Sequence, residues 1–505
     1  MEKRSIKINL IMNTILTMSA FLFPLITFPY VSRVLGAQGV GRVSFATSLV
    51  AYFNMFAQLG VPVYGIRACA RVRDDGEKLT KTAQELLIIN MIMTMIACAS
   101  LALAVIFIPR LHEEKLIYLI TGSSILLNSI GMEWLFKALE KYTYITVRSL
   151  VFKLISVCVM FALVKSQEDY AFYALVTVIA SSASYIFNFF HARRYIRLRP
   201  VWGYDLRRHM KSVMIFFAMS CAATVYTNLD SVMLGFMKDD TEVGYYHAAV
   251  RIKTLLVSIV TSLGAVLLPR ASYFIERGLR EEFRRITAKA LNFVFVCAIP
   301  LMIYFMIFAR EGVLLLSGHE FLPAVPVMQI IMPTLLFIGI TNILGIQVLV
   351  PAGYEKYVLY SEIGGALCDL VLNALLIPGM GAAGAAIGTL AAEGVVLLIQ
   401  VYYLRQVGDL ILQGTLAPDA GTEHREKIKG AAMLFMKIAA AALAGTFACI
   451  WVKDLNLHVF FIMLISAALF FGIYVLALLL MKEELMTGIL YDLLKRLPGG
   501  FGLRK

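Results

Sequence analysis

The residues best suited to chemistry in this 505-residue chain are ionisable side chains that interrupt long apolar segments. A charge near the centre of a bilayer costs at least about 2.5–3.5 kcal/mol on insertion scales, so a retained charge indicates a function. Arg148 and Lys153 share one such segment, and Glu362 and Asp369 share another. At 1.5 Å per helical residue, Lys153 and Asp369 lie about 14 and 18 Å from the ends of their helices, near mid-membrane.

These charges predict two functional regions, a basic one that binds the substrate and an acidic one that binds a coupling ion. We expect Lys153, with Arg148, to face a hydrated cavity and attract an anionic substrate. We expect Asp369, with Glu362 or Glu393, to exchange a coupling ion, H⁺ or Na⁺; apart from such an ion the sequence predicts no cofactor. The alternative is a structural ion pair, since a buried lysine and a carboxylate at one depth can neutralise each other.

A second group of charges is expected at the outer ends of four helices: Arg33, Arg42, Asp230, Arg251 and Lys253. The four cations predict a basic outer mouth that binds the substrate and releases its anionic headgroup, and the aspartate is a further ion-coupling candidate. Each cation could instead extend its charge to the membrane interface. We predict no catalytic residue and no metal site, because the seven cysteines are isolated and resemble small reduced hydrophobes.

Membrane-spanning helices are the elements that must position these charges. Apolar residues make up 60% of the chain and charged residues only 16%, which excludes a separate soluble enzyme domain. Apolar runs of about 20 residues, enough to cross the hydrocarbon core, recur from end to end. They predict an all-α polytopic membrane protein with fourteen transmembrane helices, at residues 10–31, 43–63, 86–108, 116–136, 144–164, 170–190, 212–235, 250–269, 290–309, 324–347, 357–377, 382–403, 431–451 and 459–481.

The distribution of basic residues orients these helices. Of the 46 lysines and arginines, 33 fall in connections on the side of the termini and ten on the other side. Both termini are therefore predicted to be cytoplasmic. The net charge of +13 is then explained by orientation and by attraction to anionic lipids, so nucleic acid is excluded as a partner. The densest basic stretch, residues 191–211, is interpreted as a cytoplasmic connection.

An internal repeat predicts two related lobes. SRVLG at 32–36 corresponds to SVMLG at 231–235, and Gly41 corresponds to Gly244. Further matching pairs are also separated by about 200–215 positions in the sequence. Six crossings return a chain to its starting side, so the two lobes are predicted to be parallel, as in two-lobe transporters. Pro24 and Pro29 are expected to interrupt helix one.

The predicted organisation follows from this repeat and from the two helices that remain. It comprises an N-terminal lobe (1–200), a C-terminal lobe (201–410), a cytoplasmic linker (411–430), and helices thirteen and fourteen with a cytoplasmic tail (431–505).

Several of these segments resemble a known family. The stretch FPYVSRVLGAQGVGRVSFATSLVAYFNMFAQLGVPVYGIRACARVRDD at 28–75 resembles the N-terminal signature of Wzx-type oligosaccharide flippases. LGIQVLVPAGYEKY at 344–357 and NALLIPGMGAAGAAIGTLAAE at 373–393 are similar to the C-terminal lobe of polysaccharide-biosynthesis transporters in the MOP superfamily, which also holds MATE exporters and the lipid II flippase. The resemblance extends through helix twelve.

This resemblance implies a function that composition and spacing do not show. It implies that undecaprenyl-pyrophosphate-linked oligosaccharide repeat units, such as those of O-antigen lipopolysaccharide, cross a bacterial inner membrane by alternating access. It also implies a cationic lumen for the pyrophosphate. The lipid bilayer and, as open possibilities, a polysaccharide polymerase and a chain-length regulator are the further partners.

Three alternatives stay open. A MATE-like cation-coupled drug exporter would favour acidic residues in both lobes, whereas the N-terminal helices lack a mid-membrane carboxylate and Glu133 falls at a helix end. A membrane-embedded glycan polymerase or ligase would need polar catalytic residues on a large outer loop, and none is predicted. A non-transport member of a polysaccharide assembly complex would leave the intramembrane charges without a role.

Overall fold

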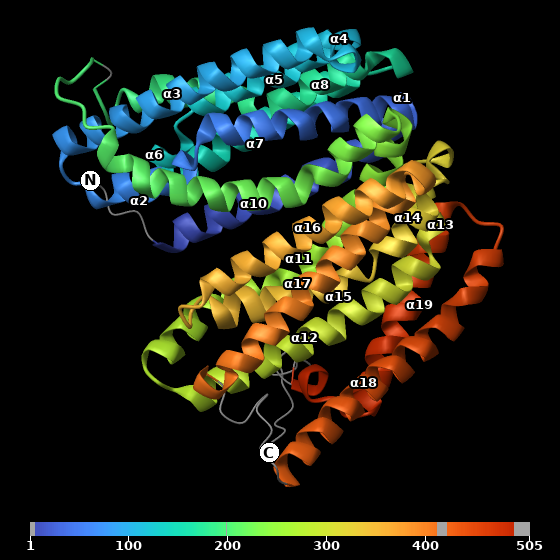
Figure 1. The fold of residues 1–505 in the computed structure, drawn as a ribbon. Helices are drawn as coiled ribbons and strands as arrows, with labels where there is room; N and C mark the ends of the chain where they lie inside the picture. Colours follow the sequence, from blue (N-terminus) through green and yellow to red (C-terminus); the bar gives the residue numbers. More distant parts are fainter. Residues whose placement is uncertain (1–5, 198, 412–421, 489–505) are drawn as a thin grey trace. The chain divides into compact units, whose positions relative to one another are not determined.

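Long apolar helices dominate the computed structural model, which describes residues 6–197, 199–411 and 422–488 (Figure 1). Thirteen segments of this described part are long and apolar enough to cross a membrane. Their bounds are Ile11–Arg71, Gly76–Phe107, Lys115–Ala138, Tyr142–Leu163, Gln167–Ala192, Arg207–Met237, Asp240–Glu276, Arg280–Ile307, Ala324–Leu349, Glu355–Met380, Ala382–Gln406, Ala432–Asp454 and Val459–Leu480. The chain is therefore a multi-pass membrane protein, as the composition predicts.

The first segment contains two of the predicted crossings. It has 61 residues, and at 1.5 Å per residue a helix of that length far exceeds the roughly 30 Å hydrocarbon core. Its long helix α1 (Ile6–Gln58) breaks at Gly36, where φ is 67° and ψ is −176°. Since 10–31 and 43–63 lie on either side of this break, the thirteen segments accommodate the fourteen predicted crossings.

The break in helix one is not where the sequence places it. Pro24 and Pro29 both lie inside α1, and the only non-helical backbone angles in this helix are those of Gly36. Membrane helices tolerate proline where other groups satisfy the freed carbonyls, whereas glycine alone enters the left-handed region without steric cost. The amide of Ala37, freed by the break, donates to Glu320 Oε1 at 2.9 Å.

The described helices group into two compact units. Unit 1 comprises Met1–His247 with Leu316–Phe321 and Ile377–Ala382, and unit 2 comprises Ala248–Leu315, Leu322–Leu376 and Ala383–Lys505. The predicted boundary between the lobes at residue 200 stays a prediction. The helices before residue 247 are α1 and then α2 (Val61–Arg71), α3 (Gly76–Phe107), α4 (Pro109–Glu113), α5 (Lys115–Ile130), α6 (Glu133–Ala138), α7 (Tyr142–Leu163), η1 (Gln167–Asp169), α8 (Tyr170–Val178), η2 (Ile179–Ala183), α9 (Tyr185–Ala192) and α10 (Arg207–Met237).

Unit 1 is organised around α1, which packs against α3, α5, α7 and α10. Two glycines at equivalent positions of the internal repeat meet here. A methyl group on Gly41 would overlap the Asp240 carbonyl, and one on Gly244 would overlap the Ala37 carbonyl. The backbones of α1 and of the start of α11 (Asp240–Glu276) therefore touch, which small residues permit in membrane helices.

Unit 2 contains the rest of α11 and the remaining long helices. Its element bounds are α12 (Arg280–Ile307), α13 (Ala309–Leu316), α14 (Ala324–Ile331), α15 (Thr334–Thr341), η4 (Asn342–Leu349), α16 (Glu355–Met380), α17 (Ala382–Ile411), α18 (Thr422–Cys449), η5 (Ile450–Asp454) and α19 (Val459–Leu480), while the short η3 (His319–Phe321) belongs to unit 1. Of the predicted linker 411–430, residues 412–421 lie outside the described residues, and α18 already begins at Thr422. The predicted tail after residue 488 also lies outside them.

The two additional C-terminal helices form a pair on α12 (Figure 1). Polar contacts fix their register, because the Tyr304 hydroxyl lies 2.9 Å from Ser466 Oγ and the Tyr474 hydroxyl donates to the Val296 carbonyl at 2.9 Å. Both tyrosine side chains are almost fully buried, so their hydroxyls need these partners.

Candidate functional site

Lys153 occupies the middle of α7, at half-buried depth, against α1. Its ammonium donates to Ser19 Oγ at 2.7 Å, and the Ser19 hydroxyl donates to the Leu16 carbonyl at 2.7 Å. Among the described residues, no carboxylate lies within ion-pair distance of Lys153. The ammonium is thus held by a neutral hydroxyl and keeps its charge available to an anion.

Arg148 lies one and a half turns earlier on α7 and is 8% exposed. Its Nη2 lies 3.3 Å from Glu133 Oε2, and Lys137 Nζ lies 2.8 Å from the other oxygen of that carboxylate. The guanidinium carbon lies 5.8 Å from the centre of the Tyr144 ring and 5.1 Å from that of Tyr185. One carboxylate is therefore shared by two cations.

The predicted acidic group lies in unit 2. Asp369 on α16 is 2% exposed, Glu393 on α17 is 5% exposed, and Glu362 is half-buried. A methyl group on Gly388 of α17 would lie 3.0 Å from Asp369 Oδ1 and would overlap Asn373 Oδ1. Both side-chain oxygens therefore face the same point on α17, where the glycine leaves room for them. Oxygen ligands of this kind fit a proton or a hard cation. Among the described residues there is no group of three His, Cys, Asp or Glu that could hold a metal ion.

The predicted outer group divides between the units. Arg33, Arg42 and Asp230 belong to unit 1, and half-buried Arg251 and Lys253 belong to unit 2. Arg33 is exposed and donates to the Pro29 carbonyl at 2.5 Å, and buried Asp230 accepts a hydrogen bond from Tyr246. Substrate binding by these cations and ion coupling by Asp230 therefore remain predictions.

The surroundings of Arg42 correct one part of that prediction. Arg42 lies 3.3 Å from Glu114 and 3.6 Å from Asp240, which also pairs with Arg110 at 2.9 Å. A cavity of about 280 Å³ here is lined by three cations and four carboxylates. The corner is therefore balanced in charge rather than basic, because the carboxylates at the ends of neighbouring helices converge on the arginines.

A chain of uncharged polar groups crosses the interior of unit 1. Gln58 Nε2 and Asn128 Nδ2 each donate to Asn54 Oδ1 at 3.1 Å, and Ser182 Oγ donates to Asn128 Oδ1 at 2.9 Å. Ser182 belongs to η2, a π-helical turn, and such turns are frequent at functional sites. Asn54 and Gln58 are four residues apart on α1, so their side chains lie on the same face of the helix.

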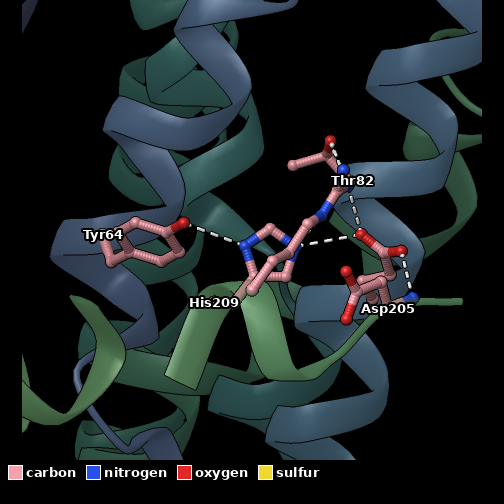
Figure 2. Close-up of polar contacts among 6 residues, drawn as sticks. Tyr64, Thr82, Asp205 and His209 are labelled. Carbon is pink, nitrogen blue, oxygen red and sulfur yellow. Dashed lines mark hydrogen bonds and ion pairs between the residues drawn. The ribbon is translucent and has the colours of Figure 1, made fainter. Parts of the chain in front are cut away.

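The sequence reasoning missed a buried network around Glu85 of α3 (Figure 2). The Glu85 carboxylate is fully buried and accepts from the Asp205 amide at 2.8 Å and from Arg208. His209 Nε2 lies 2.9 Å from the same carboxylate, and His209 Nδ1 lies 2.9 Å from the Tyr64 hydroxyl. Figure 2 shows how these side chains converge from α2, α3 and the start of α10.

Gln84, the neighbour of Glu85, binds the connection between α9 and α10. Its Nε2 donates to the carbonyl groups of Arg197 at 2.5 Å and Arg199 at 2.8 Å, and its Oε1 accepts from the Tyr204 hydroxyl at 2.7 Å. Two adjacent residues of α3 thus fix the segment that leads into α10. Described residues of the stretch 191–211, which the sequence predicts to be a cytoplasmic connection, are therefore held by specific contacts.

The fold is similar to the folds of two solved transporters. It is similar to the lipid II flippase MurJ in an inward closed conformation, with a TM-score of 0.69 and 16% identity over 96% of this chain and 99% of that one. It is also similar to an inward-facing multidrug resistance MATE family transporter of the MOP superfamily, with a TM-score of 0.61 and 13% identity over 78% of this chain and 96% of that one. The predicted fold class is confirmed.

The sequence comparisons identify the family. The chain belongs to the polysaccharide biosynthesis protein family, whose model matches residues 6–275. The MatE model matches residues 216–375. The chain is 25% identical to a putative O-antigen transporter of Escherichia coli (strain K12), over 80% of this chain and 98% of that relative. It is 26% identical to a putative O-antigen transporter of Shigella dysenteriae, over 75% and 95%. The resemblance to Wzx-type flippases of the MOP superfamily is thereby confirmed.

Proposed function

We propose that this protein is a flippase that translocates lipid-linked oligosaccharide repeat units across the membrane for surface polysaccharide biosynthesis. The observation that carries the proposal is likeness over most of the chain, in sequence to relatives named O-antigen transporters and in fold to a lipid II flippase. These names describe transporters, which supports transport rather than catalysis. We further propose that the lipid to which the oligosaccharide is linked is undecaprenyl pyrophosphate.

Lys153 is the residue that we propose binds the anionic part of the substrate. An ammonium near mid-membrane whose hydrogen-bond partner, within the described part of the chain, is a serine hydroxyl keeps a large electrostatic free energy, because the surrounding dielectric constant is low. A pyrophosphate would gain this interaction when it leaves the membrane surface. Arg148, Arg33, Arg251 and Lys253 remain proposed contributors to the same anionic path.

A coupling ion, H⁺ or Na⁺, is proposed to bind in unit 2. The oxygens of Asp369 and Asn373, which face Gly388 together, support this position better than Glu362, which is only half-buried. Glu393 and Asp230 are the remaining candidates. Proton or sodium exchange at Asp369 would change the charge of unit 2 by one unit, which is enough to bias a two-state transporter.

The orientation and the further partners are also part of the proposal. Basic residues are more numerous in the connections on the side of the termini, which supports cytoplasmic termini. The relatives named O-antigen transporters support an inner-membrane location. A polysaccharide polymerase and a chain-length regulator are proposed partners, since a repeat unit must be polymerised after translocation.

The MATE-like alternative has less support. The MatE model matches only residues 216–375, and the MATE structure has the lower of the two TM-scores. Two buried carboxylates of unit 1 already have partners: Glu85 is bonded to Arg208 and close to His209, and Asp230 accepts a hydrogen bond from Tyr246. A cationic drug would have to displace these partners.

The test is transport of a lipid-linked oligosaccharide in proteoliposomes, read as accessibility of the sugar in each leaflet, with and without a proton or sodium gradient. We compare the wild type with Lys153→Ala and Asp369→Asn. The matched control is Lys165→Ala, because Lys165 is exposed just beyond the end of α7.

We expect Lys153→Ala to reduce transport by about tenfold or more, because one buried charge-assisted contact is worth at least about 1.4 kcal/mol. We expect Asp369→Asn to remove the response to the gradient, and Lys165→Ala to leave transport unchanged. Wild-type transport in both Lys153→Ala and Asp369→Asn, at matched amounts of folded protein, would refute the assignment of these residues. If vesicles with and without the protein show the same movement of the sugar under every gradient, the proposal that the protein is a flippase is refuted.

A further inference from the structure

A cavity of about 440 Å³ lies on unit 1 between the first turns of α7 and the end of α9. Its lining is Tyr144, Arg148, Val151, Phe152, Phe187, Phe190, His191 and Arg194. The wall is largely aromatic. The rings of Tyr144 and His191 are stacked with centroids 4.3 Å apart, and those of Phe152 and Phe187 lie 5.5 Å apart.

The cavity carries more positive than negative charge. Glu133 is shared between Lys137 and Arg148, so one carboxylate offsets two cations beside the cavity, and Arg194 at its rim adds a third cation. The Nε and Nη1 atoms of Arg148 have no hydrogen-bond partner among the described residues, although the side chain is more than nine-tenths buried. Unused donors on a buried guanidinium are costly, and an anion is the group that satisfies them best.

The position of the cavity matches the depth of lipid headgroups. Arg148 lies about 9 Å along α7 from its first residue, and Arg194 follows the last turn of α9 at the same end. This end is predicted to be cytoplasmic. Val151, Phe187 and Phe190 are between 46% and 57% exposed, as expected for side chains that face acyl chains. Basic pockets between membrane helices on the cytoplasmic side are typical sites for phosphate-bearing headgroups.

The lining favours one kind of phosphate. It contains no Asn, Gln, Ser, Thr, Asp or Glu side chain, which are the usual partners of sugar hydroxyls. The hydroxyls of a sugar-bearing headgroup would therefore have only the tyrosine, histidine and arginine side chains of the lining as hydrogen-bond partners. Free phosphate would not use the exposed apolar wall. A small anionic headgroup with an attached hydrocarbon tail uses both the arginines and the phenylalanines.

We propose that the cavity between α7 and α9 binds the phosphate headgroup of an anionic phospholipid from the adjacent leaflet, with Arg148 and Arg194 as its cationic contacts and the tail along Val151 and Phe187. This site does not depend on the proposed transport function, because any anionic phospholipid of the bilayer satisfies it.

The experiment counts lipids bound to the full chain, purified in detergent, by native mass spectrometry. The probes are phosphatidylglycerol, phosphatidylcholine, a polyprenyl pyrophosphate and inorganic phosphate, each titrated separately. The variants are Arg194→Ala, Arg148→Met and the control Arg199→Ala, which removes an equal charge from an exposed residue whose backbone, not side chain, contacts Gln84. Circular dichroism and thermal unfolding establish that each variant is folded.

The wild type should bind one phosphatidylglycerol more tightly than phosphatidylcholine. We expect Arg194→Ala and Arg148→Met each to weaken this affinity by about tenfold, and Arg199→Ala to leave it unchanged. Equal affinity for both phospholipids, or equal weakening by Arg194→Ala and Arg199→Ala, would overturn the proposal. Binding of polyprenyl pyrophosphate or inorganic phosphate but not phosphatidylglycerol at these arginines would overturn the choice of ligand. None of these outcomes depends on whether the protein transports oligosaccharide.

Discussion

Glu85 and Arg148 are buried charges of unit 1, near the ends of α3 and α7 that are predicted to face the same side of the membrane. The Glu85 carboxylate receives a backbone amide and an arginine and lies 2.9 Å from His209 Nε2. The Arg148 guanidinium keeps one carboxylate at 3.3 Å, which it shares with Lys137, and its Nε and Nη1 have no acceptor among the residues that the structure describes. This difference shows that burial alone does not identify a binding site. We call a charge saturated when its hydrogen-bonding atoms all have partners within the protein. A saturated buried charge stabilises the fold, whereas a buried charge with unused donors can bind a ligand.

Replacing the saturated charge should have the largest effect. Glu85→Ala leaves Arg208, His209 and the Asp205 amide without their acceptor, and breaking a buried ionic network by removing one member costs about 3–5 kcal/mol. We expect a large fall in the melting temperature of the purified protein, measured by thermal unfolding in detergent. The control is Glu77→Ala, an exposed glutamate on the same helix, which should melt like the wild type. A Glu85→Ala protein as stable as this control would show that the network does not hold α2, α3 and α10 together.

Replacing the unsaturated charge should have a much smaller effect on stability. Arg148→Met keeps an unbranched side chain of similar length, and Glu133 retains Lys137 as a partner at 2.8 Å. We expect a change in the free energy of unfolding of about 1 kcal/mol or less, because apolar replacement of a poorly compensated buried ion is often neutral. The same thermal unfolding assay measures it. A loss as large as that of Glu85→Ala would mean that Arg148 is a structural residue, and the contrast between the two charges would fail.

An exposed carboxylate on the same helix as Glu85 sharpens the comparison and should have the smallest effect. Asp75 caps α3, and the Lys78 amide, the Lys78 ammonium and the Glu77 amide hold the pKa of Asp75 below its ordinary value of 3.8. Its contribution to stability is therefore present above pH 3.8 and is lost as the pH falls through the lowered pKa. We expect Asp75→Ala to melt slightly below the wild type at pH 6, and the difference between the two melting temperatures to shrink as the pH falls through the lowered pKa of Asp75. A difference that grows as the pH falls would contradict the cap.

Much of the fold could be predicted from the sequence because each crossing is a local property. Each of the fourteen predicted windows overlaps one of the thirteen apolar segments of the described part, and the paired C-terminal helices also lie where the hydropathy places them. Local reasoning was wrong for the break in α1, because Pro24 and Pro29 stay within the helix and Gly36 breaks it. The carboxylate of Glu320, 283 positions from Ala37, accepts the amide that this break exposes.

The candidate site was only partly predictable for the same reason. The sequence located Lys153, Arg148 and Asp369 inside apolar helices, and Arg148 and Asp369 are buried within the protein. It could not find Glu85 as a network centre, because Glu85 and His209 are 124 positions apart and each looks like an ordinary helix-end residue. The available signal in the sequence was that Glu85 directly precedes the apolar run 86–108 and that a dense basic stretch at 191–211 could supply a partner.

The sequence by itself determined that the chain crosses the membrane many times and which family it belongs to, since both follow from composition and motifs along the chain. Only the tertiary structure decided which charges are satisfied. Glu85 is saturated, Lys153 contacts a serine hydroxyl, Arg42 is balanced by carboxylates, and Arg148 retains unused donors beside a cavity. The free energy of a buried charge depends on the groups within a few ångströms of it, and helices distant in the sequence supply most of those groups.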